Sequence, residues 1–388
     1  MNVLELNDIK SGPTTDVEAN LTQLEYVAMN STLNLADGHA RQQLSAGQAS
    51  IIEDLPALFR EAERTSVDIL ERRAHTAFFE MLGQHSYPGH TTGRVLPCYA
   101  SSVAMEILAR ALATTVDAVA LVHPTFDNIP DILRGVGIDL IPIEEDVLHA
   151  GDLPDELLQG VGAVFITTPN NPTGRVVSHE RLLRLALQCA DRDVILCLDT
   201  SFRGFDVAAQ YDHYAILEES GCRWAVVEDT GKLWPTLDLK IGWLTSSADI
   251  GIPVGKIYSD ILLGVSPLIL SLVHRFAEDG AAGGLTELQS FIRDNRNIVR
   301  STLSGISGVT FPDTASRGSV ERIFLGDRSA MDVWRRLADL QVYALPCHKF
   351  HWAHPEAGHN SLRLALARST PIITRSASIV ADVLGTKG

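Results

Sequence analysis

Apolar residues follow two different spacings along this chain. From Gly93 onward, short and nearly continuous apolar runs alternate with segments in which apolar residues recur every three or four positions. The runs are typical of strands in a parallel sheet covered on both faces, and the second spacing is typical of amphipathic helices. The pattern therefore predicts an α/β fold with a mostly parallel central sheet. Its expected strands are residues 119–122, 138–143, 163–168, 194–198, 224–227 and 241–245.

Both ends of the chain differ from this central part. Residues 1–50 are polar and have no strong period, which predicts an N-terminal arm or lid laid over the protein rather than part of its core. From about residue 285 a long charged helix, 285–303, is followed by a mixed α+β pattern. We expect a large domain over residues 51–284 and a smaller C-terminal domain over residues 285–388.

Charge and hydropathy narrow the range of partners. The formal net charge of −16 repels a phosphate backbone, so neither nucleic acid nor an anionic membrane is an expected partner. The longest apolar run, residues 261–273, is well short of the ~20 residues that span a bilayer. The 5 cysteines form no C-x-x-C pair, and the N-terminus does not resemble a secretory signal. We therefore expect reduced cysteines, no metal site and a cytoplasmic protein.

Candidate binding residues lie on both sides of the apolar run 119–122. Ser101 and Ser102 stand before an apolar-periodic segment, where hydroxyls and free N–H groups at a helix start form a phosphate cup, or where a serine is an ordinary N-cap. Phe126 follows a run in the string HPTF, where an aromatic ring stacks on a planar cofactor or packs in the core. Neither signal is specific by itself.

The next two runs end in more specific residues. Asn171 lies in TTPNNPTG, whose prolines fix a turn that presents the asparagine side chain as a neutral hydrogen-bond donor. Asp199 comes directly after five apolar residues, where a carboxylate is costly unless it is paired, for example with a protonated pyridine nitrogen. The alternative for Asp199 is a helix N-cap.

A lysine follows the fifth run, 224–227. Lys232 stands two residues after the hydroxyl of Thr230, and Lys240 lies eight residues further on. A lysine beside a hydroxyl after a buried strand suits a Schiff-base amine, although a single lysine is usually a surface residue.

Together these positions resemble the fold-type-I pyridoxal-phosphate (PLP) enzymes of the class I/II aminotransferase kind, over about residues 90–370. The resemblance implies that Lys232 binds PLP covalently, Asp199 binds the pyridine nitrogen, Asn171 binds the phenolic oxygen and Phe126 stacks on the ring. It also implies that Arg363 binds the substrate carboxylate. The implied phosphate ligands are Ser101, Ser102, Thr230 and Lys240.

Two positions depart from the usual aminotransferase pattern. Phe202 stands where these enzymes carry a tyrosine that binds the phenolic oxygen, and Ser201 is the nearest hydroxyl. Lys240 replaces the usual phosphate-binding arginine. Both changes argue against ordinary transamination, and the phenylalanine at position 202 argues against it more strongly than Lys240 does.

A narrower resemblance covers nearly the whole chain. The segments NLTQLEY, NLADGHAR, HPTFDNI, LDTSFRGFD and EDTGKLWPTLDLK are similar to PLP- and dioxygen-dependent L-arginine hydroxylase/oxidases of actinobacterial natural-product pathways. This resemblance implies that O2 oxidises L-arginine, via quinonoid intermediates and without metal or flavin, to 4-hydroxy-2-ketoarginine and 2-ketoarginine, with ammonia and H2O2 released. Glu25 and Asp229, with Thr22, would bind the guanidinium, and His39 would act as an acid or base.

Two other functions share this fold. An aminotransferase acting on arginine or another basic amino acid would use 2-ketoacid acceptors and form no peroxide. A non-catalytic sensor is disfavoured by the intact Lys232 and by the lack of room for a DNA-binding domain. By analogy with fold-type-I enzymes we expect a homodimer.

Overall fold

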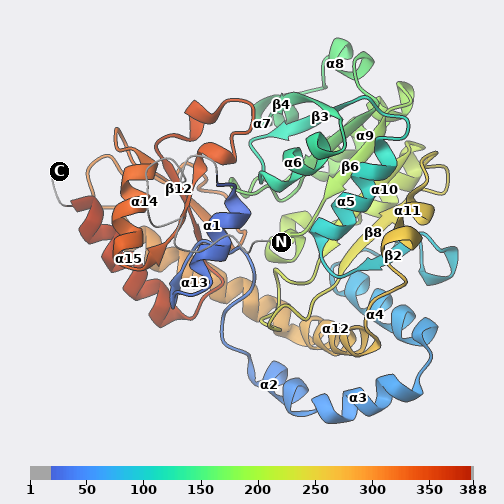
Figure 1. Ribbon diagram of the computed structural model, residues 1–388, viewed down its shortest axis with the longest axis horizontal. Coiled ribbons are helices and arrows are strands. Elements are labelled where there is room, and N and C mark those ends of the chain that lie inside the picture. Colours follow the sequence, from blue (N-terminus) through green and yellow to red (C-terminus); the bar gives the residue numbers. More distant parts are fainter. Residues whose placement is uncertain (1–18, 386–388) are drawn as a thin grey trace, which may run out of the picture.

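The computed structural model describes residues 19–385 (Figure 1). Residues 1–18, which begin the predicted arm, and residues 386–388 lie outside the described part. The larger sheet lies on the right of Figure 1, and the C-terminal helices lie on the left.

The larger sheet has seven strands in the order β2-β8-β7-β6-β5-β3-β4. The five strands from β3 to β7 are mutually parallel, which confirms the predicted α/β fold. The strands are β2 (Val95–Cys98), β3 (Ala118–His123), β4 (Asp139–Glu144), β5 (Ala163–Thr167), β6 (Ile195–Asp199), β7 (Trp224–Asp229) and β8 (Gly242–Ser246).

Strand β8 runs antiparallel to both of its neighbours. The sequence predicts a strand there but does not reveal its direction. The reason for the reversal lies in the connection from β7, residues 230–241, which contains no helix. A parallel neighbour needs a crossover of a dozen or more residues, usually with a helix, whereas an antiparallel strand does not.

The central strands are apolar throughout because both faces of the sheet are covered. Val164 and Leu196 belong to one buried cluster and Phe165 and Cys197 to the other, as expected for residues that alternate between faces. Each fully buried side chain of this size stabilises the fold by about 1.5–3 kcal/mol. Helices α4 (Val67–Met81), α9 (His179–Asp191), α10 (His213–Ser220) and α12 (Pro267–Asp279) contribute to the first cluster, and α5 (Ser101–Leu112), α6 (Asn128–Gly135) and α11 (Val254–Ile261) to the second.

The C-terminal part contains a three-stranded antiparallel sheet in the order β11-β12-β9. The long charged helix predicted at residues 285–303 is confirmed as α13, and it follows α12 through a π-helical turn, Gly280–Gly284. The predicted domain boundary at residue 284 coincides with this turn and stays a prediction. The elements are β9 (Val320–Phe324), β11 (Leu345–Pro346), β12 (Ser361–Ala365), α13 (Leu285–Leu303), α14 (Ala330–Asp339) and α15 (Thr370–Gly385).

The described part of the arm is built into the C-terminal part. Strand β1 (Leu33–Asn34) pairs in parallel with β10 (Val342–Tyr343), and helix α1 (Leu21–Ala28) buries Leu21 and Leu24. The expectation that this stretch adds nothing to the core was wrong, because a few leucines among many polar residues are enough to anchor it. The remaining helices are α2 (Ala46–Glu53), α3 (Leu55–Arg64), α7 (Glu145–Ala150) and α8 (Asp155–Gln159).

Candidate active site

A cavity of about 340 Å³ lies at the carboxyl ends of the parallel strands. Ligands bind at this edge of open α/β sheets, where side chains from several strands converge. Of the residues predicted from sequence, Thr230 and Arg363 are buried beside the cavity but do not line it. Those that line it are Thr22, Glu25, His39, Ser101, Ser102, Phe126, Asn171, Asp199, Ser201, Asp229, Lys232 and Lys240.

The first turn of α5 faces the cavity. Ala100 occupies the N-cap position, and no side chain of the described residues caps the helix, so the N-cap alternative for Ser101 and Ser102 was wrong. Ser101 instead donates its hydroxyl hydrogen to Oδ2 of Asp229 at 2.7 Å. The first N–H groups of α5 therefore remain available for an anion, which the positive end of the helix dipole favours.

The other two predicted phosphate ligands have partners within the protein. Oγ1 of Thr230 accepts the backbone N–H of Ile241 at 2.8 Å, which leaves its hydroxyl hydrogen to donate. Nζ of Lys240 lies 2.6 Å from Nε2 of His39 and 3.4 Å from Oδ1 of Asp238. Their roles as phosphate ligands stay predictions.

Replacing Gly242 with alanine should damage both the fold and this anion site. A Cβ at Gly242 would lie 2.5 Å from the backbone nitrogen of Ser101 and would also meet the carbonyl carbon of Ala100. Because backbone has to shift, we expect a loss of about 1–3 kcal/mol and a lower melting temperature by calorimetry, with weaker PLP retention. Gly255→Ala is the control, since its Cβ meets open space on α11. Equal melting temperatures for both variants would contradict the prediction.

Asp199 ends β6 and is buried. Its Oδ1 accepts the backbone N–H of Ser201 at 3.0 Å and the Ser201 hydroxyl at 2.6 Å. Burial raises the pKa of Asp199, and these hydrogen bonds and the nearby charge of Lys232 offset part of that rise. No helix begins at Asp199, so the N-cap alternative was wrong. Ser201 contacts Asp199, and its predicted role as a cofactor hydroxyl is not tested by this contact.

Lys232 lies in the loop after β7 and lines the cavity. Its Nζ is 5.8 Å from the centre of the Phe202 ring, which occupies the position of the usual tyrosine. A Cβ placed on Gly38 would lie 3.9 Å both from this Nζ and from Oε1 of Glu25. The arm therefore lies directly over the lysine amine.

Asp229 stands beside the lysine with both carboxylate oxygens engaged. Oδ1 accepts the N–H of Gly231 at 2.6 Å, and Oδ2 accepts the Ser101 hydroxyl. Burial would raise the pKa of Asp229, but the positive charges of Lys232 and Lys240 and the hydrogen bond from Ser101 lower it below its ordinary value. The carboxylate is therefore ionised, and its predicted contact with a guanidinium stays a prediction.

Asn171 and Phe126 lie at the ends of two neighbouring strands. The Oδ1 atom of Asn171 is buried and has no partner among the described residues. Phe126 packs edge-on against Phe350, with ring centres 5.7 Å apart. A buried amide without a partner is unusual and fits a polar group of a bound cofactor.

Glu25, which lines the cavity, binds Arg363, which is buried beside it. Nη2 of Arg363 lies 3.1 Å from Oε1 of Glu25, and its Nη1 donates to the carbonyl of Ala36 at 2.6 Å. Arg363 is fully buried on β12, whereas Glu25 comes from α1. The pair therefore links α1 of the arm to β12 of the C-terminal sheet.

The arm is also bound at its start. The backbone N–H of Leu21 donates to Oδ2 of Asp127 at 2.7 Å, at the first residue of α1. Burial raises the pKa of Asp127 to about 7. This contact holds the helix that carries Thr22 and Glu25 over the cavity.

Sequence reasoning did not assign functions to three buried residues around His39 and α1. Asp37 binds the His39 ring, Arg368 binds backbone carbonyls of the arm, and Asp127 binds the start of α1. The one available signal was the spacing of Asp37, His39 and Arg41, because acids and bases two residues apart bind each other in a turn. The long-range contacts of Asp127 and Arg368 left no pattern in the sequence.

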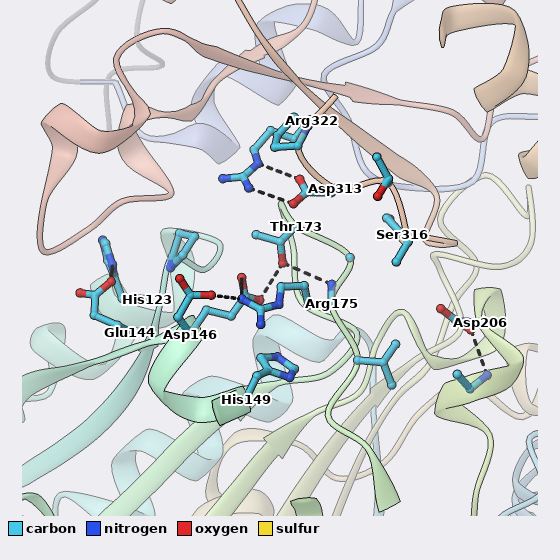
Figure 2. Close-up of a pocket in the computed structure, with 18 residues that line it drawn as sticks. His123, Glu144, Asp146, His149, Thr173, Arg175, Asp206, Asp313, Ser316 and Arg322 are labelled. Atoms are coloured by element: carbon cyan, nitrogen blue, oxygen red, sulfur yellow. Dashed lines mark hydrogen bonds and ion pairs between the residues drawn. The ribbon is translucent and has the colours of Figure 1, made fainter. Parts of the chain in front are cut away.

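A second cavity, of about 690 Å³, borders the same turn, residues 170–174 (Figure 2). Several of its charged side chains are paired with one another. Arg322 binds Asp313 through two hydrogen bonds, and Arg175 binds Asp146 at 2.7 Å. None of the predicted catalytic or cofactor-binding residues lines this cavity, whereas most of them line the smaller one.

The geometry agrees with the comparison to known families. Residues 66–375 match the family described as aminotransferase class I and II. The chain belongs to this family. It is therefore a fold-type-I, PLP-dependent enzyme.

Curated aminotransferases match parts of the chain. LL-diaminopimelate aminotransferase of Desulforudis audaxviator is 26% identical over 159 residues, which is 40% of this chain and 39% of the relative. Histidinol-phosphate aminotransferase 1 of Pasteurella multocida is 22% identical over 234 residues, 58% of this chain and 63% of the relative. These matches span less than two thirds of each relative.

Solved structures match over greater lengths. Aspartate aminotransferase of Thermus thermophilus with maleate has a TM-score of 0.76 at 15% identity, covering 99% of this chain and 100% of that chain, which supports the fold alone. The structure of MppP soaked with the product 2-ketoarginine has a TM-score of 0.89 at 60% identity. It covers 90% of this chain and 99% of that chain.

Residues 19–385 contain neither a membrane-spanning helix nor a cluster of metal ligands. No helix in this range is long and apolar enough to cross a bilayer. No group of three or more His, Cys, Asp and Glu side chains there is arranged to hold a metal ion.

Proposed function

We propose that this protein uses O2 to oxidise L-arginine to 4-hydroxy-2-ketoarginine and 2-ketoarginine, with release of ammonia and H2O2, in a natural-product pathway. The observation that carries the proposal is the 60% identity to MppP, whose structure was determined with the product 2-ketoarginine. Because 2-ketoarginine is the oxidative deamination product of arginine, the similarity supports arginine as the substrate.

The cavity has suitable ligands for PLP. The buried carboxylate of Asp199 suits a protonated pyridine nitrogen, and the side-chain amide nitrogen of Asn171 would donate to the phenolic oxygen. Lys232 would hold the cofactor covalently, and Phe126 would stack on its ring. When bound, PLP stabilises negative charge that develops at the substrate Cα. The phosphate would be bound by Ser101, Ser102, Thr230 and Lys240.

The substrate would be held at both ends. Arg363 suits the α-carboxylate, because a guanidinium binds a carboxylate through two parallel hydrogen bonds. Glu25, with Asp229 and Thr22, suits the substrate guanidinium. Since Glu25 and Arg363 bind each other in the structure, the substrate has to separate them and give each a new partner of opposite charge. A basic amino acid does this, whereas a neutral one leaves Glu25 unpaired, which is costly in a half-buried site.

Replacing Glu25 with glutamine should weaken arginine binding and reduce discrimination against neutral side chains. Breaking a partly buried charge pair costs about 2–5 kcal/mol, so we expect the Kd for L-arginine to rise at least tenfold. We expect the preference for L-arginine over its neutral isostere L-citrulline to fall by a similar factor. Calorimetric titration of the PLP-loaded protein with each amino acid measures both effects.

The matched control for this substitution is Glu53→Gln, an exposed acid on α2. It should leave both affinities and the PLP content unchanged. An unchanged affinity of the Glu25→Gln protein for arginine would remove Glu25 from the substrate site.

The balance of electrons constrains the products. Converting the amine of arginine to a ketone removes two electrons, which reduces one O2 to H2O2. Introducing a hydroxyl at C4 removes two more electrons, so the hydroxylated product requires a second O2 if all oxygen becomes peroxide. Water then supplies the new hydroxyl.

We propose that no flavin or metal takes part. Oxygen uptake by the PLP-loaded protein with L-arginine tests the proposal.

His39 is the candidate acid or base for the steps after oxidation. It lines the cavity beside Lys232, and imidazole is the common proton carrier near neutral pH. Its proposed task is to move a proton at the water that adds to the oxidised substrate.

We also propose a homodimer, by analogy with fold-type-I enzymes. Several large apolar side chains are exposed in the single chain, including Leu237, Leu239, Ile261 and Leu263. Burial of such residues against a second copy would favour association. A monomeric mass in light scattering would contradict this proposal.

The alternative is an aminotransferase acting on arginine or another basic amino acid. The family match and the curated relatives support it. It predicts 2-ketoacid-dependent turnover without oxygen uptake, and the absence of the usual tyrosine at Phe202 argues against it.

A further inference from the structure

We propose that Asp37 is a positioning residue that fixes the tautomer of His39, with the ring hydrogen on Nδ1 and a bare Nε2 turned to the cavity. This tautomer is the one that lets His39 accept a proton in the proposed function, so its catalytic importance rests on that function. The geometry that carries it involves only residues of this chain.

One ring nitrogen of His39 contacts a carboxylate, and the other contacts an ammonium group. Nδ1 lies 2.6 Å from Oδ1 of Asp37, and Nε2 lies 2.6 Å from Nζ of Lys240. An ammonium group has only hydrogen-bond donors, so Nε2 has to be the acceptor in the second contact. The single ring hydrogen of the neutral imidazole is then on Nδ1 and is donated to Asp37.

Asp37 is held as a permanent carboxylate. Burial would raise the pKa of Asp37, but the hydrogen bonds that it accepts from His39 and the charge of Arg368 lower it far below its ordinary range. Its Oδ2 accepts Nε of Arg41 at 3.0 Å, and its Oδ1 also accepts the backbone N–H of His39 at 2.9 Å. Asp37 therefore accepts from His39 and does not take up its proton.

The backbone around His39 is fixed independently of the ring. Arg368, which is buried, donates to the carbonyls of Asn34, Asp37 and His39. The N–H of the next residue, Ala40, donates to the carbonyl of Gly231 at 3.1 Å. The arm is therefore bound to Gly231, the residue before Lys232. Because these contacts fix the backbone of His39, only its imidazole ring is left to rotate, and the hydrogen bond to Asp37 prevents that rotation.

A fixed ring has a consequence for the site. The ammonium of Lys240 has three hydrogens, so it can donate one to a phosphate and another to Nε2 at the same time. If Lys240 instead turns the second hydrogen away from Nε2 and toward the phosphate, Nε2 is free to accept a proton from water in the cavity. A carboxylate that holds an imidazole in the correct tautomer raises the rate without touching the reacting atoms.

The wild-type holoenzyme tests the assignment directly. Nitrogen NMR of the PLP-loaded protein with ¹⁵N-labelled histidine distinguishes a protonated Nδ1 from a protonated Nε2, and the His39→Gln protein identifies the His39 signals. We expect a protonated Nδ1 and a bare Nε2. A protonated Nε2 would overturn the proposal, whatever the variants do.

Asp37→Asn tests the consequence. The amide of asparagine can donate to Nδ1 and so move the ring hydrogen to Nε2, where it meets Lys240. We expect the NMR signature to invert and kcat for the hydroxylated product to fall about tenfold or more, with KM for arginine changed less than threefold. Asp238→Asn is the control, because Asp238 binds Lys240 and Arg41 but does not contact His39. It should leave the His39 signals in place.

The outcomes separate the two proposals. An unchanged His39 signature in Asp37→Asn, or an equal fall of kcat in Asp238→Asn, would overturn the positioning role. If the wild-type signature is as expected but His39→Gln forms the same products at the same rate, the tautomer assignment stands and the catalytic role of His39 in the proposed function fails.

Discussion

The Lys232→Ala protein is expected to lose covalent PLP and at least about a thousandfold of its turnover with arginine. Lys232 lines the cavity, with its Nζ close to Gly38 and to the Phe202 ring. It would bind the cofactor and move the proton at the substrate Cα, and a positioned proton-transfer group alone contributes about 10²–10⁴ in rate. Absorbance of the purified protein and single-turnover kinetics measure the two losses.

Lys256→Ala is the matched control for this lysine. Lys256 is exposed on α11 and pairs only with Asp260 one turn away, a contact worth little. It should retain its PLP absorbance and its turnover. A Lys232→Ala protein that retains the absorbance of a covalently bound cofactor would contradict the assignment of Lys232.

The Asp199→Asn protein is expected to lose activity and, in its cofactor-free form, to gain stability. Asparagine can still accept both hydrogen bonds from Ser201, so the local fold is kept. It cannot pair with a protonated pyridine nitrogen, and breaking a buried charge pair costs about 3–5 kcal/mol, or more than a hundredfold. Turnover and PLP affinity measure this loss.

The gain in stability follows from the pKa of Asp199. Because burial raises that pKa above the value in the unfolded chain, the cofactor-free protein loses stability as the pH rises from the ordinary aspartate range through the raised pKa. Asparagine removes this loss. At neutral pH the cofactor-free Asp199→Asn protein should melt at or above the wild-type temperature, whereas exposed Asp249→Asn should change neither property. A lower melting temperature would contradict the prediction.

The sequence predicted the strands and the candidate residues at their ends well, for a physical reason. A parallel sheet covered on both faces needs apolar runs, and the residue that follows such a run lies at the edge where ligands bind. Asn171 and Asp199 were found by this reasoning, Lys232 by the loop after β7, and Asp229 only by the resemblance to arginine hydroxylase/oxidases. The direction of β8 was not predictable because both kinds of strand have the same apolar pattern.

The contacts of the arm could not be predicted in the same way. Glu25 is 338 residues from its partner Arg363, and Leu21 is 106 residues from Asp127. No local period reports such pairs, because each is created by the packing of elements that are distant in sequence. Even the proposed role of Asp37, which is only two residues from His39, depends on the contact of Lys240 with the other ring nitrogen of His39.

The most direct test of the proposed function is oxygen consumption by the PLP-loaded protein with L-arginine and no ketoacid, followed together with H2O2 and product masses. The proposed function predicts oxygen uptake, ammonia release and peroxide, with one O2 for each 2-ketoarginine and two for each 4-hydroxy-2-ketoarginine. If oxygen is not consumed and pyridoxamine phosphate accumulates until a 2-ketoacid is added, the protein is an aminotransferase and the proposed oxidation is wrong.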